Sequence, residues 1–376
     1  MSFLKPILFI IAILSFVIGP QAFAQEVHQD VQGIWRARVI EVINQEKKTV
    51  PGTDTLSTYQ TLKAELLEGE RKGQVVTIEN DYLTLKNGDK FFLFYTIDIN
   101  GNEMYSVRDI DRRVTIGIFV GLFVLTIIAF GGKQGLRSII SLAGSFFVIL
   151  YVLVPSLLKG YPPVPTSIAI ASVILFLAIF LTHGFNRESL VAFIGTVSAV
   201  ILTGILAYLG VTLARLSGFA SDEAVYLNLA TRGALDFSGL LLGGIMIGVL
   251  GVLDDIAVTQ SAVVSELYNS ASHLSKKEIY TKAIRVGKEH VGALVNTLAL
   301  AYTGASLPLL LLFSTSESTL ASIINQEIFA TEIIRTIVGS VGLILTVPIT
   351  TLLAVYMLKG YKVKHNDHHG HSHVHH

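Results

Sequence analysis

Two adjacent carboxylates, Asp254 and Asp255, end a long apolar run and are the residues best placed to do chemistry. If the run continues as a helix, Asp255, Thr259 and Glu266 fall on one stripe, since residues four and eleven apart share a helical face. A carboxylate at the end of an apolar run is costly unless it is paired, hydrated or bound to an ion. The stripe therefore predicts binding of an inorganic cation or a proton. The alternative is an interfacial acidic pair at the cytoplasmic end of a membrane span.

A second group of polar residues repeats every seven positions further along the chain. Glu289, Asn296 and Thr303 are nearly two helical turns apart, so they stack along one seam. We expect this seam to face the acidic stripe and to continue a path for the ion. The alternative is structural, because Asn and Thr often join membrane helices by hydrogen bonds.

The predicted ligands are oxygen atoms throughout, which sets the class of ion. Carboxylate and amide oxygens suit hard or borderline cations such as magnesium, calcium and manganese, and carboxylates can also relay protons. The chain has no cysteine, which excludes disulfides, thiolate catalysis and cysteine-based zinc or iron–sulfur sites. A divalent metal ion is therefore expected as substrate, and no cofactor is assigned.

Histidine is concentrated at the C-terminus, where seven of the eleven histidines occupy the last twelve positions. Imidazole-dense tails bind zinc, nickel or copper loosely, so an accessory metal role is expected for this segment. The alternative is an appended or incidental tail. The candidate ligands are His365, His368, His369, His371 and His373.

These residues must be positioned by a membrane protein. Of the 376 residues, 51% are hydrophobic and only 15% are charged, whereas soluble domains carry about 25% charged residues. The net charge of zero gives no field that would favour nucleic acid. Apolar runs close to the ~20 residues that cross a bilayer predict seven helical spans. The spans are 114–130, 138–157, 167–183, 190–211, 236–254, 291–313 and 333–358.

Small residues in the fifth of these spans indicate close helix packing. Gly244, Gly248 and Gly251 lie on one helical face with the spacing that lets a neighbouring backbone approach. We expect them to be packing residues within the bundle or within a homo-oligomer.

The exported N-terminal part divides into two segments. Residues 1–24 are predicted to be a secretory signal peptide, with Lys5, an apolar stretch and Ala22-Phe23-Ala24 before the expected cleavage site; an uncleaved anchor is the alternative. Residues 25–112 contain short β-rich runs separated by glycines, which predict a small OB-like or SH3-like β-barrel. The expected strands are 35–42, 60–66, 74–78 and 90–97.

The distribution of basic residues predicts the orientation. Lysines and arginines are concentrated after the first, third, fifth and seventh spans, which become cytoplasmic if the β-domain is outside. The expected chain therefore has an extracytoplasmic β-domain, a transmembrane domain at 113–358 and a cytoplasmic tail at 359–376.

Two segments carry a resemblance to a known family. They are Gly248–Leu267 (GVLGVLDDIAVTQSAVVSEL) and Gly287–Pro308 (GKEHVGALVNTLALAYTGASLP). With a β-domain before a multi-span region, the chain resembles the YibE/F-like family of bacterial multi-pass membrane proteins, over nearly its whole length after the signal. The resemblance implies this architecture and a bacterial cytoplasmic-membrane location more than a reaction. The histidine-rich tail is not part of it.

The leading functional hypothesis is a gradient-driven transporter or permease for an inorganic cation, with Glu266 and Glu289 at the cytoplasmic mouth. No P-loop motif is present, so ATP hydrolysis by this chain is not expected. The alternative is a non-catalytic assembly protein whose β-domain binds an envelope partner. An enzyme is not expected, because an intramembrane aspartyl protease needs its two aspartates on separate facing helices, and here they are adjacent.

Overall fold

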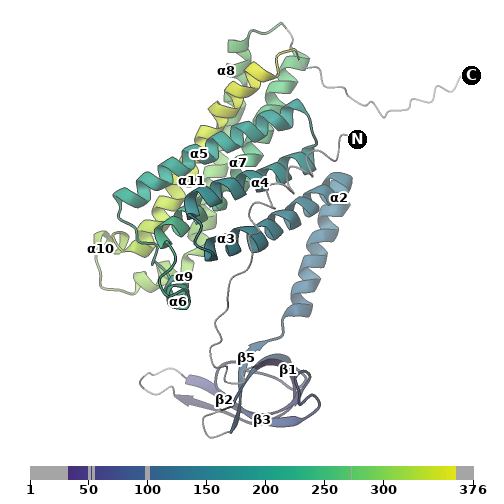
Figure 1. Ribbon diagram of the computed structural model, residues 1–376, viewed down its shortest axis with the longest axis vertical. Helices are drawn as coiled ribbons and strands as arrows, with labels where there is room; N and C mark the ends of the chain where they lie inside the picture. The colour runs from purple at the N-terminus through teal and green to yellow at the C-terminus, as the bar shows by residue number, and fades with distance from the viewer. Residues whose placement is uncertain (1–32, 50–51, 53–55, 98–101, 272, 361–376) are drawn as a thin grey trace, which may run out of the picture. The chain divides into compact units, whose positions relative to one another are not determined.

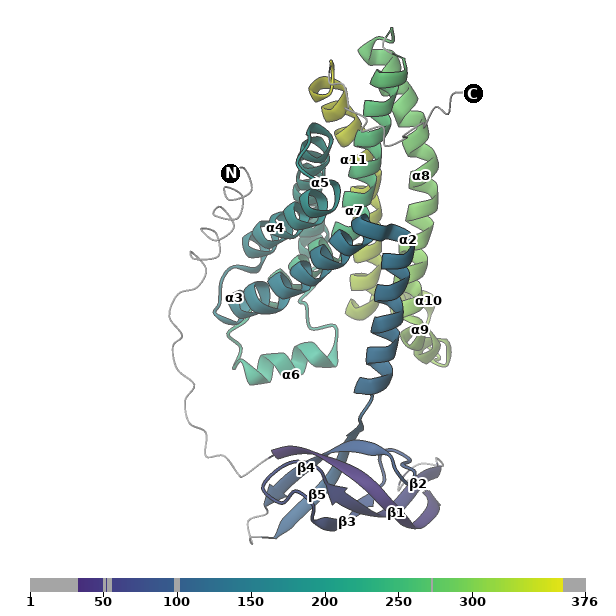
Figure 2. The ribbon, with the colours of Figure 1, turned by 90° about the vertical axis from the view of Figure 1, so that its right-hand side faces the viewer.

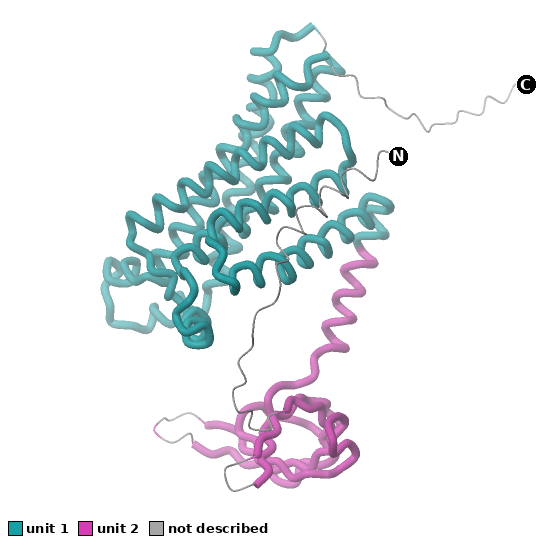
Figure 3. The backbone as a smooth tube through the Cα atoms, viewed as in Figure 1, with its two compact units in different colours: residues 1–18, 127–376 teal, residues 19–126 magenta. Residues whose placement is uncertain are grey.

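The computed structural model describes residues 33–49, 52, 56–97, 102–271 and 273–360. The chain forms two compact units, divided between Thr126 and Ile127 (Figure 3). The expected signal peptide at 1–24 and the histidine-rich tail lie outside the described residues, so both remain predictions.

The first unit contains a five-stranded antiparallel sheet (Figure 1). Its order is β3-β2-β1-β4-β5, so that β1 pairs with both β2 and β4. The strands are β1 Gly33–Thr49, β2 Leu56–Leu66, β3 Val75–Asn80, β4 Lys90–Ile97 and β5 Glu103–Ile110. The two edge strands, β3 and β5, approach each other, which curls the sheet into a half-barrel.

The sheet buries one face, as its alternating sequence predicts. Ala37 and Val39 of β1 point into the core, which they share with Leu62 of β2 and Phe91 and Leu93 of β4. The four expected strands are confirmed, and β1 and β2 are longer than expected. The fifth strand was not predicted from the sequence, although its apolar positions alternate with Ser106, Arg108 and other polar residues as in a half-buried strand.

The second unit is helical. Helix α2 begins in the first unit and continues into the second. The helical elements are α2 Arg113–Val148, the π-helical turn η1 Ile149–Leu153, α3 Val154–Leu158, α4 Pro163–His183, α5 Arg187–Leu213, α6 Asp222–Ala230, α7 Phe237–Ser270, α8 Lys276–Ala305, α9 Leu307–Ser314, α10 Leu320–Ile324 and α11 Glu327–Met357. Side chains cap several of these helices: the Asp236 carboxylate accepts from the Gly239 amide at 2.9 Å, and Ser275 and Glu278 form a capping box.

Among the described residues, five helical stretches are long and apolar enough to cross a membrane, or six if the bent pair α8 and α9 is one span. This count differs from the seven expected spans. The difference arises because 114–130 and 138–157 run into one helical stretch, Arg113–Leu158, and because α8 and α9 meet at 62°. The membrane class of the protein is nevertheless supported.

Helices α7 and α11 form the centre of the bundle, with α5 packed against both and α8 packed mainly against α11. Figure 2 shows α7, α8 and α11 running side by side. Val249 and Leu253 of α7 meet Leu343 and Val347 of α11 in the largest apolar core of the bundle. The middle of α7 is therefore packed against α11 on one face.

Two of the three glycines of α7 make no close contact with another described part of the chain, so their predicted role in packing within a homo-oligomer stays a prediction. A Cβ added at Gly244 or Gly251 would meet no described atom within 4 Å, and one added at Gly248 would meet only the Tyr302 hydroxyl, at 3.2 Å. Close helix approach is instead made by Gly243, where an added Cβ would lie 2.4 Å from the Ser167 hydroxyl of α4. The physical reason is that the face of Gly244 points out of the bundle, about 100° from the buried face of Gly243.

Candidate functional site

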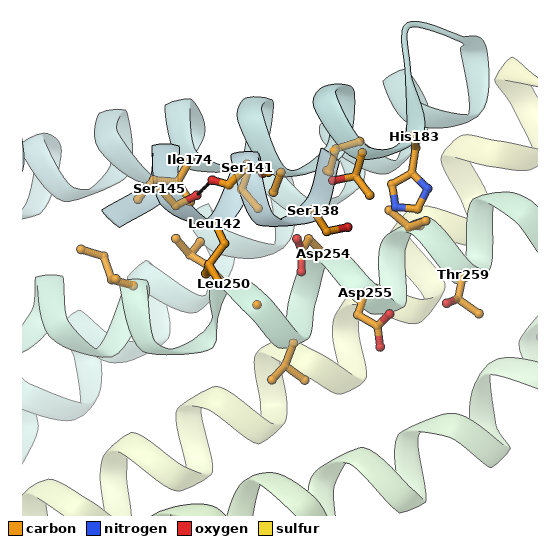
Figure 4. Close-up of a pocket in the computed structure, with 18 of the residues that line it drawn as sticks. Ser138, Ser141, Leu142, Ser145, Ile174, His183, Leu250, Asp254, Asp255 and Thr259 are labelled. Carbon is orange, nitrogen blue, oxygen red and sulfur yellow. Dashed lines mark hydrogen bonds between the residues drawn. The ribbon is translucent and has the colours of Figure 1, made fainter. Parts of the chain in front are cut away.

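The helical unit contains a cavity of about 720 Å³ between the second half of α2, α4 and α7 (Figure 4). Its walls are largely apolar, with Ile174, Leu250 and Leu294 among the lining residues. Set into these walls is a group of polar side chains from three helices. They are Ser138, Ser141, Ser145, Thr182, His183, Asp254, Asp255 and Thr259.

Helix α7 supplies both carboxylates. Asp254 lies 17 residues after Phe237 and 16 before Ser270, so the acidic pair is in the middle of a continuous helix and not at its end. The side chain of Asp254 turns toward α2, and Asp255 and Thr259 lie further along the same wall (Figure 4). Asp254 is half-buried and Asp255 is exposed. The three predicted residues therefore line the same cavity, and their role in binding stays a prediction.

Helix α2 supplies a ladder of hydroxyl groups that we call the serine ladder: Ser138, Ser141 and Ser145. The three residues are three and four positions apart, so they share one helical face. Ser138 and Ser145 donate hydrogen bonds to the carbonyl oxygens of Gln134 at 3.2 Å and Ser141 at 2.9 Å. Because these hydroxyl groups donate their protons to carbonyls of their own helix, their oxygen lone pairs remain free to accept hydrogen bonds from groups in the cavity.

Helix α4 closes the cavity with Thr182 and His183 in its last turn. His183 lies within electrostatic range of Asp255. Among the described lining residues, none is lysine or arginine. Two carboxylates and one imidazole are therefore the only titratable side chains among the described lining residues, whose remaining polar side chains are hydroxyls.

Four predicted site residues are not brought to this cavity. Glu266, Glu289, Asn296 and Thr303 are all exposed, and none of them lines it. Helix α8 turns Leu294 toward the cavity, whereas Asn296 lies on its exposed face. The expected arrangement, with the polar seam of α8 facing the acids of α7, is therefore not found among the described residues.

No group of three or more histidine, aspartate or glutamate side chains that could hold a metal ion occurs among the residues that the structure describes. The cavity therefore offers no cage of direct ligands of the kind that zinc prefers. What it offers is a set of oxygen acceptors spread over its walls.

The serine ladder, Thr182 and His183 were missed in the sequence. The helical spacing of the three serines can be read from the sequence. However, a serine that donates to a carbonyl of its own helix adds little free-energy cost to an apolar span, so it does not stand out by composition. Thr182 and His183 end an apolar run just before Gly184. A polar pair at this position is typical of an ordinary helix end and does not by itself indicate a site.

The comparisons with known proteins bear on both units. A family model described as "YibE/F-like protein" matches residues 119–360, which is more than half of the chain. The chain belongs to the YibE/F family. A second model, "YibE/F family N-terminal domain", matches residues 34–106 and so covers the strands of this YibE/F protein up to the middle of β5. No curated protein and no solved structure matches the chain significantly.

All polar residues of the cavity fall inside the range matched by the larger YibE/F model. The cavity is thus part of the family domain and is not a feature of an added segment. The family match supports the predicted architecture and carries no information about the ion or the partner.

Proposed function

We propose that this YibE/F protein is a gradient-driven transporter or permease for an inorganic cation, with its binding site in the cavity between α2, α4 and α7. The observation that carries the proposal is the lining: hydroxyl oxygens and two carboxylates without any lysine or arginine among the described lining residues. Within an apolar bundle, such a surface repels anions and offers a cation the oxygens that replace bulk water.

Asp254 and Asp255 would bind the ion or a coupled proton, and Thr259 would extend the site along α7. His183 adds an imidazole within electrostatic range of Asp255. We do not include Glu266, Glu289, Asn296 or Thr303 in the binding site, because their side chains are exposed away from the cavity.

The topology that fits this function has seven spans. The chain leaves helical geometry at Gly132 (φ 52°, ψ −130°), which separates the two apolar halves of Arg113–Leu158. Counting these halves separately and α8 with α9 as one broken span gives the seven predicted from sequence. An odd number of spans places the β-domain and the tail on opposite sides of the membrane. The basic residues favour the orientation with the β-domain outside and the tail in the cytoplasm.

This topology suits a bacterial cytoplasmic membrane, with export directed by the signal peptide. The tail with His365 and His368 would then be a cytoplasmic accessory that senses or buffers metal. Deleting it from His365 onward should lower the metal sensitivity of transport without ending it. We propose no enzymatic activity for the chain.

Flux measurements on the reconstituted full chain test the main proposal. Proteoliposomes would be loaded with cation-sensitive dyes and challenged with magnesium, calcium, manganese and sodium under an imposed gradient. Asp254→Asn and Asp255→Asn should reduce flux strongly in protein that remains monodisperse. Asp222→Asn is the matched control, because Asp222 lies in α6 outside the cavity. Unchanged flux in both cavity variants would remove the proposed site.

The second candidate is an assembly protein that binds an envelope partner or another copy of itself. The observation in its favour is the β-unit. We infer an OB-like barrel from its strand order, in which β1 pairs with β2 and β4 while the edges β3 and β5 approach. The large apolar side chains Leu56, Val75, Tyr82 and Met104 are more than half exposed on it.

A variant lacking residues 25–112 discriminates between the two candidates. A transporter whose site lies in the helical unit should retain cation flux when this segment is removed and should lose it in the Asp254→Asn, Asp255→Asn double variant. The opposite pattern would favour partner binding.

A further inference from the structure

We propose that the cavity takes a hydrated divalent cation of the magnesium class and that the serine ladder receives hydrogen bonds from the ion's water shell. This inference rests on the proposed function and adds the substrate class and the mode of contact. It assigns Ser138, Ser141 and Ser145 to recognition of the ion through water.

The size of the cavity allows a hydrated ion to enter. Six waters at about 30 Å³ each occupy about 180 Å³. The cavity volume of about 720 Å³ holds this shell with room for further water.

The spacing of the ladder excludes direct coordination of one ion by all three serines. Ser138 and Ser145 are seven residues apart, which is about 10 Å along a helix at 1.5 Å per residue. Direct ligands of magnesium lie about 2.0–2.1 Å and those of calcium about 2.3–2.6 Å from the ion. Oxygens so far apart can contact the outside of a hydrated ion or successive positions along a path.

The carboxylates are also arranged for contact through water. Asp254 and Asp255 are neighbours on one helix, so their side chains point about 100° apart and do not converge on one atom. No third acidic or histidine ligand completes a cage among the described residues. Magnesium dehydrates reluctantly and is commonly held by one or two carboxylates while it keeps several waters.

The hydroxyl groups present the correct polarity for a water shell. Waters bound to a divalent cation are hydrogen-bond donors, so they need acceptors. Ser138 and Ser145 donate to their own helix and keep lone pairs for the cavity. Ser141 is 4% exposed, and its hydroxyl makes no hydrogen bond to another described residue although it lines the cavity. A hydroxyl that opens into a polar part of a cavity and has no protein partner is available to a bound water or a hydrated ion.

Hexaamminecobalt(III) is the probe for this mode of contact, because its ammonia ligands do not exchange and it can bind only through its outer shell. Its binding to the purified full chain would be measured by titration calorimetry, and its inhibition of magnesium flux would be measured in proteoliposomes. We expect binding that Asp254→Asn and Asp255→Asn weaken and competition with magnesium.

Serine variants test the ladder itself. Ser141→Ala should weaken binding of the complex and of magnesium by about threefold to tenfold, the effect of one hydrogen bond. Ser145→Ala is a second variant for the case that Ser141→Ala fails to fold. Ser172→Ala is the matched control, since Ser172 also bonds to its own helix, to Ile168 at 2.9 Å, and does not line the cavity.

The outcomes separate this inference from the proposed function. Magnesium flux that hexaamminecobalt(III) does not inhibit would overturn contact through water and leave transport intact. Flux of sodium alone would overturn the divalent class. Binding of the complex that depends on Asp254, without flux of any cation, would support the hydrated-ion site and overturn transport. Equal binding in Ser141→Ala, Ser145→Ala and wild type would remove the serine ladder from the site.

Discussion

The hydroxyl of Thr351 in α11 donates a hydrogen bond of 2.9 Å to the side-chain oxygen of Gln260 in α7. Both residues are almost fully buried, with exposed fractions of 0% and 1%. Gln260 follows Thr259 by one residue, so this bond fixes the rotation of α7 just beyond the cavity. It joins the two central helices of the bundle by a polar contact that neither helix can replace with water.

Replacing Thr351 by valine should therefore destabilise the bundle. Hydrogen bonds between membrane helices contribute about 0.6 kcal/mol on average and up to about 1.7 kcal/mol. A double-mutant cycle with Gln260→Leu, measured by unfolding of the full chain in mixed micelles, would give the coupling energy. Thr346→Val is the control, because Thr346 is equally buried but bonds only to its own helix at Gly342. A coupling energy of zero would contradict the interpretation.

Close glycine contacts between α5 and α11 give a second prediction. A Cβ added at Gly195 would lie 2.4 Å from the Thr350 hydroxyl oxygen, a distance that forces a shift. We expect Gly195→Ala to lower the free energy of unfolding by about 1–3 kcal/mol, the usual penalty of overpacking. Thr350→Ala in the same chain should restore much of this loss.

The matched control for that substitution is Gly244→Ala, where an added Cβ meets no described atom within 4 Å. Alanine favours the helix over glycine by about 1 kcal/mol, so this variant should be neutral or slightly more stable. Equal destabilisation by both alanines would show that Gly244 packs against another molecule, as in a homo-oligomer.

These glycines show what the sequence could and could not predict. The spacing of Gly244, Gly248 and Gly251 correctly places them on one helical face. Spacing does not reveal which face is buried, because Gly243 is buried and its neighbour Gly244 is exposed. That choice depends on α4 and Ser167, which are distant in sequence and reach Gly243 only in the folded bundle.

The same limit applies to the candidate site. Asp254, Asp255 and Thr259 could be found because charge in an apolar run is costly and therefore conspicuous. The serine ladder was invisible by this criterion, because hydroxyls bonded to their own helix carry little cost. Helix α7 packs against α4 and faces α2 across the cavity, whereas the polar seam of α8 stays exposed. This arrangement depends on side-chain packing across the bundle, which periodicity in a single helix cannot supply.

The junction after β5 gives a prediction about pH. Arg113 donates hydrogen bonds of 2.8 and 2.7 Å to the two carboxylate oxygens of Asp111, whose side chain is only 6% exposed. These bonds lower the pKa of Asp111 from 3.8 to about 2. A carboxyl group with a lowered pKa stabilises the folded state fully above its unfolded pKa, near 4. That contribution is lost as the pH falls from about 4 toward about 2.

Asp111→Asn should remove this component of acid sensitivity. Trp35 is the single tryptophan of the chain and lies in β1, so its fluorescence reports on the β-unit in the full-length protein. Denaturation midpoints at pH 5 and pH 2.5 should differ less in Asp111→Asn than in wild type. Asp81→Asn, an exposed residue of the same unit, should keep the wild-type difference. An unchanged difference in Asp111→Asn would contradict a role for the Arg113 bond.

The exposed seam of α8 gives the prediction that best separates the sequence-based site from the cavity. Asn296 is exposed and does not line the cavity, whereas Asp254 does. Asn296→Leu should therefore leave magnesium flux within about twofold of wild type, an energy below about 0.4 kcal/mol, while Asp254→Asn abolishes it. Both variants would be compared in the same proteoliposome assay, after normalisation to folded protein.

A loss of flux in folded Asn296→Leu would show that the seam lies in the ion path. An amide at an apolar helix surface also favours a partner that can hydrogen-bond to it, and a second copy can supply the same amide. Cross-linking of the full chain in membranes should then decrease in Asn296→Leu even where flux persists. Decreased cross-linking with intact flux would assign the seam to assembly and leave the cavity as the site of transport.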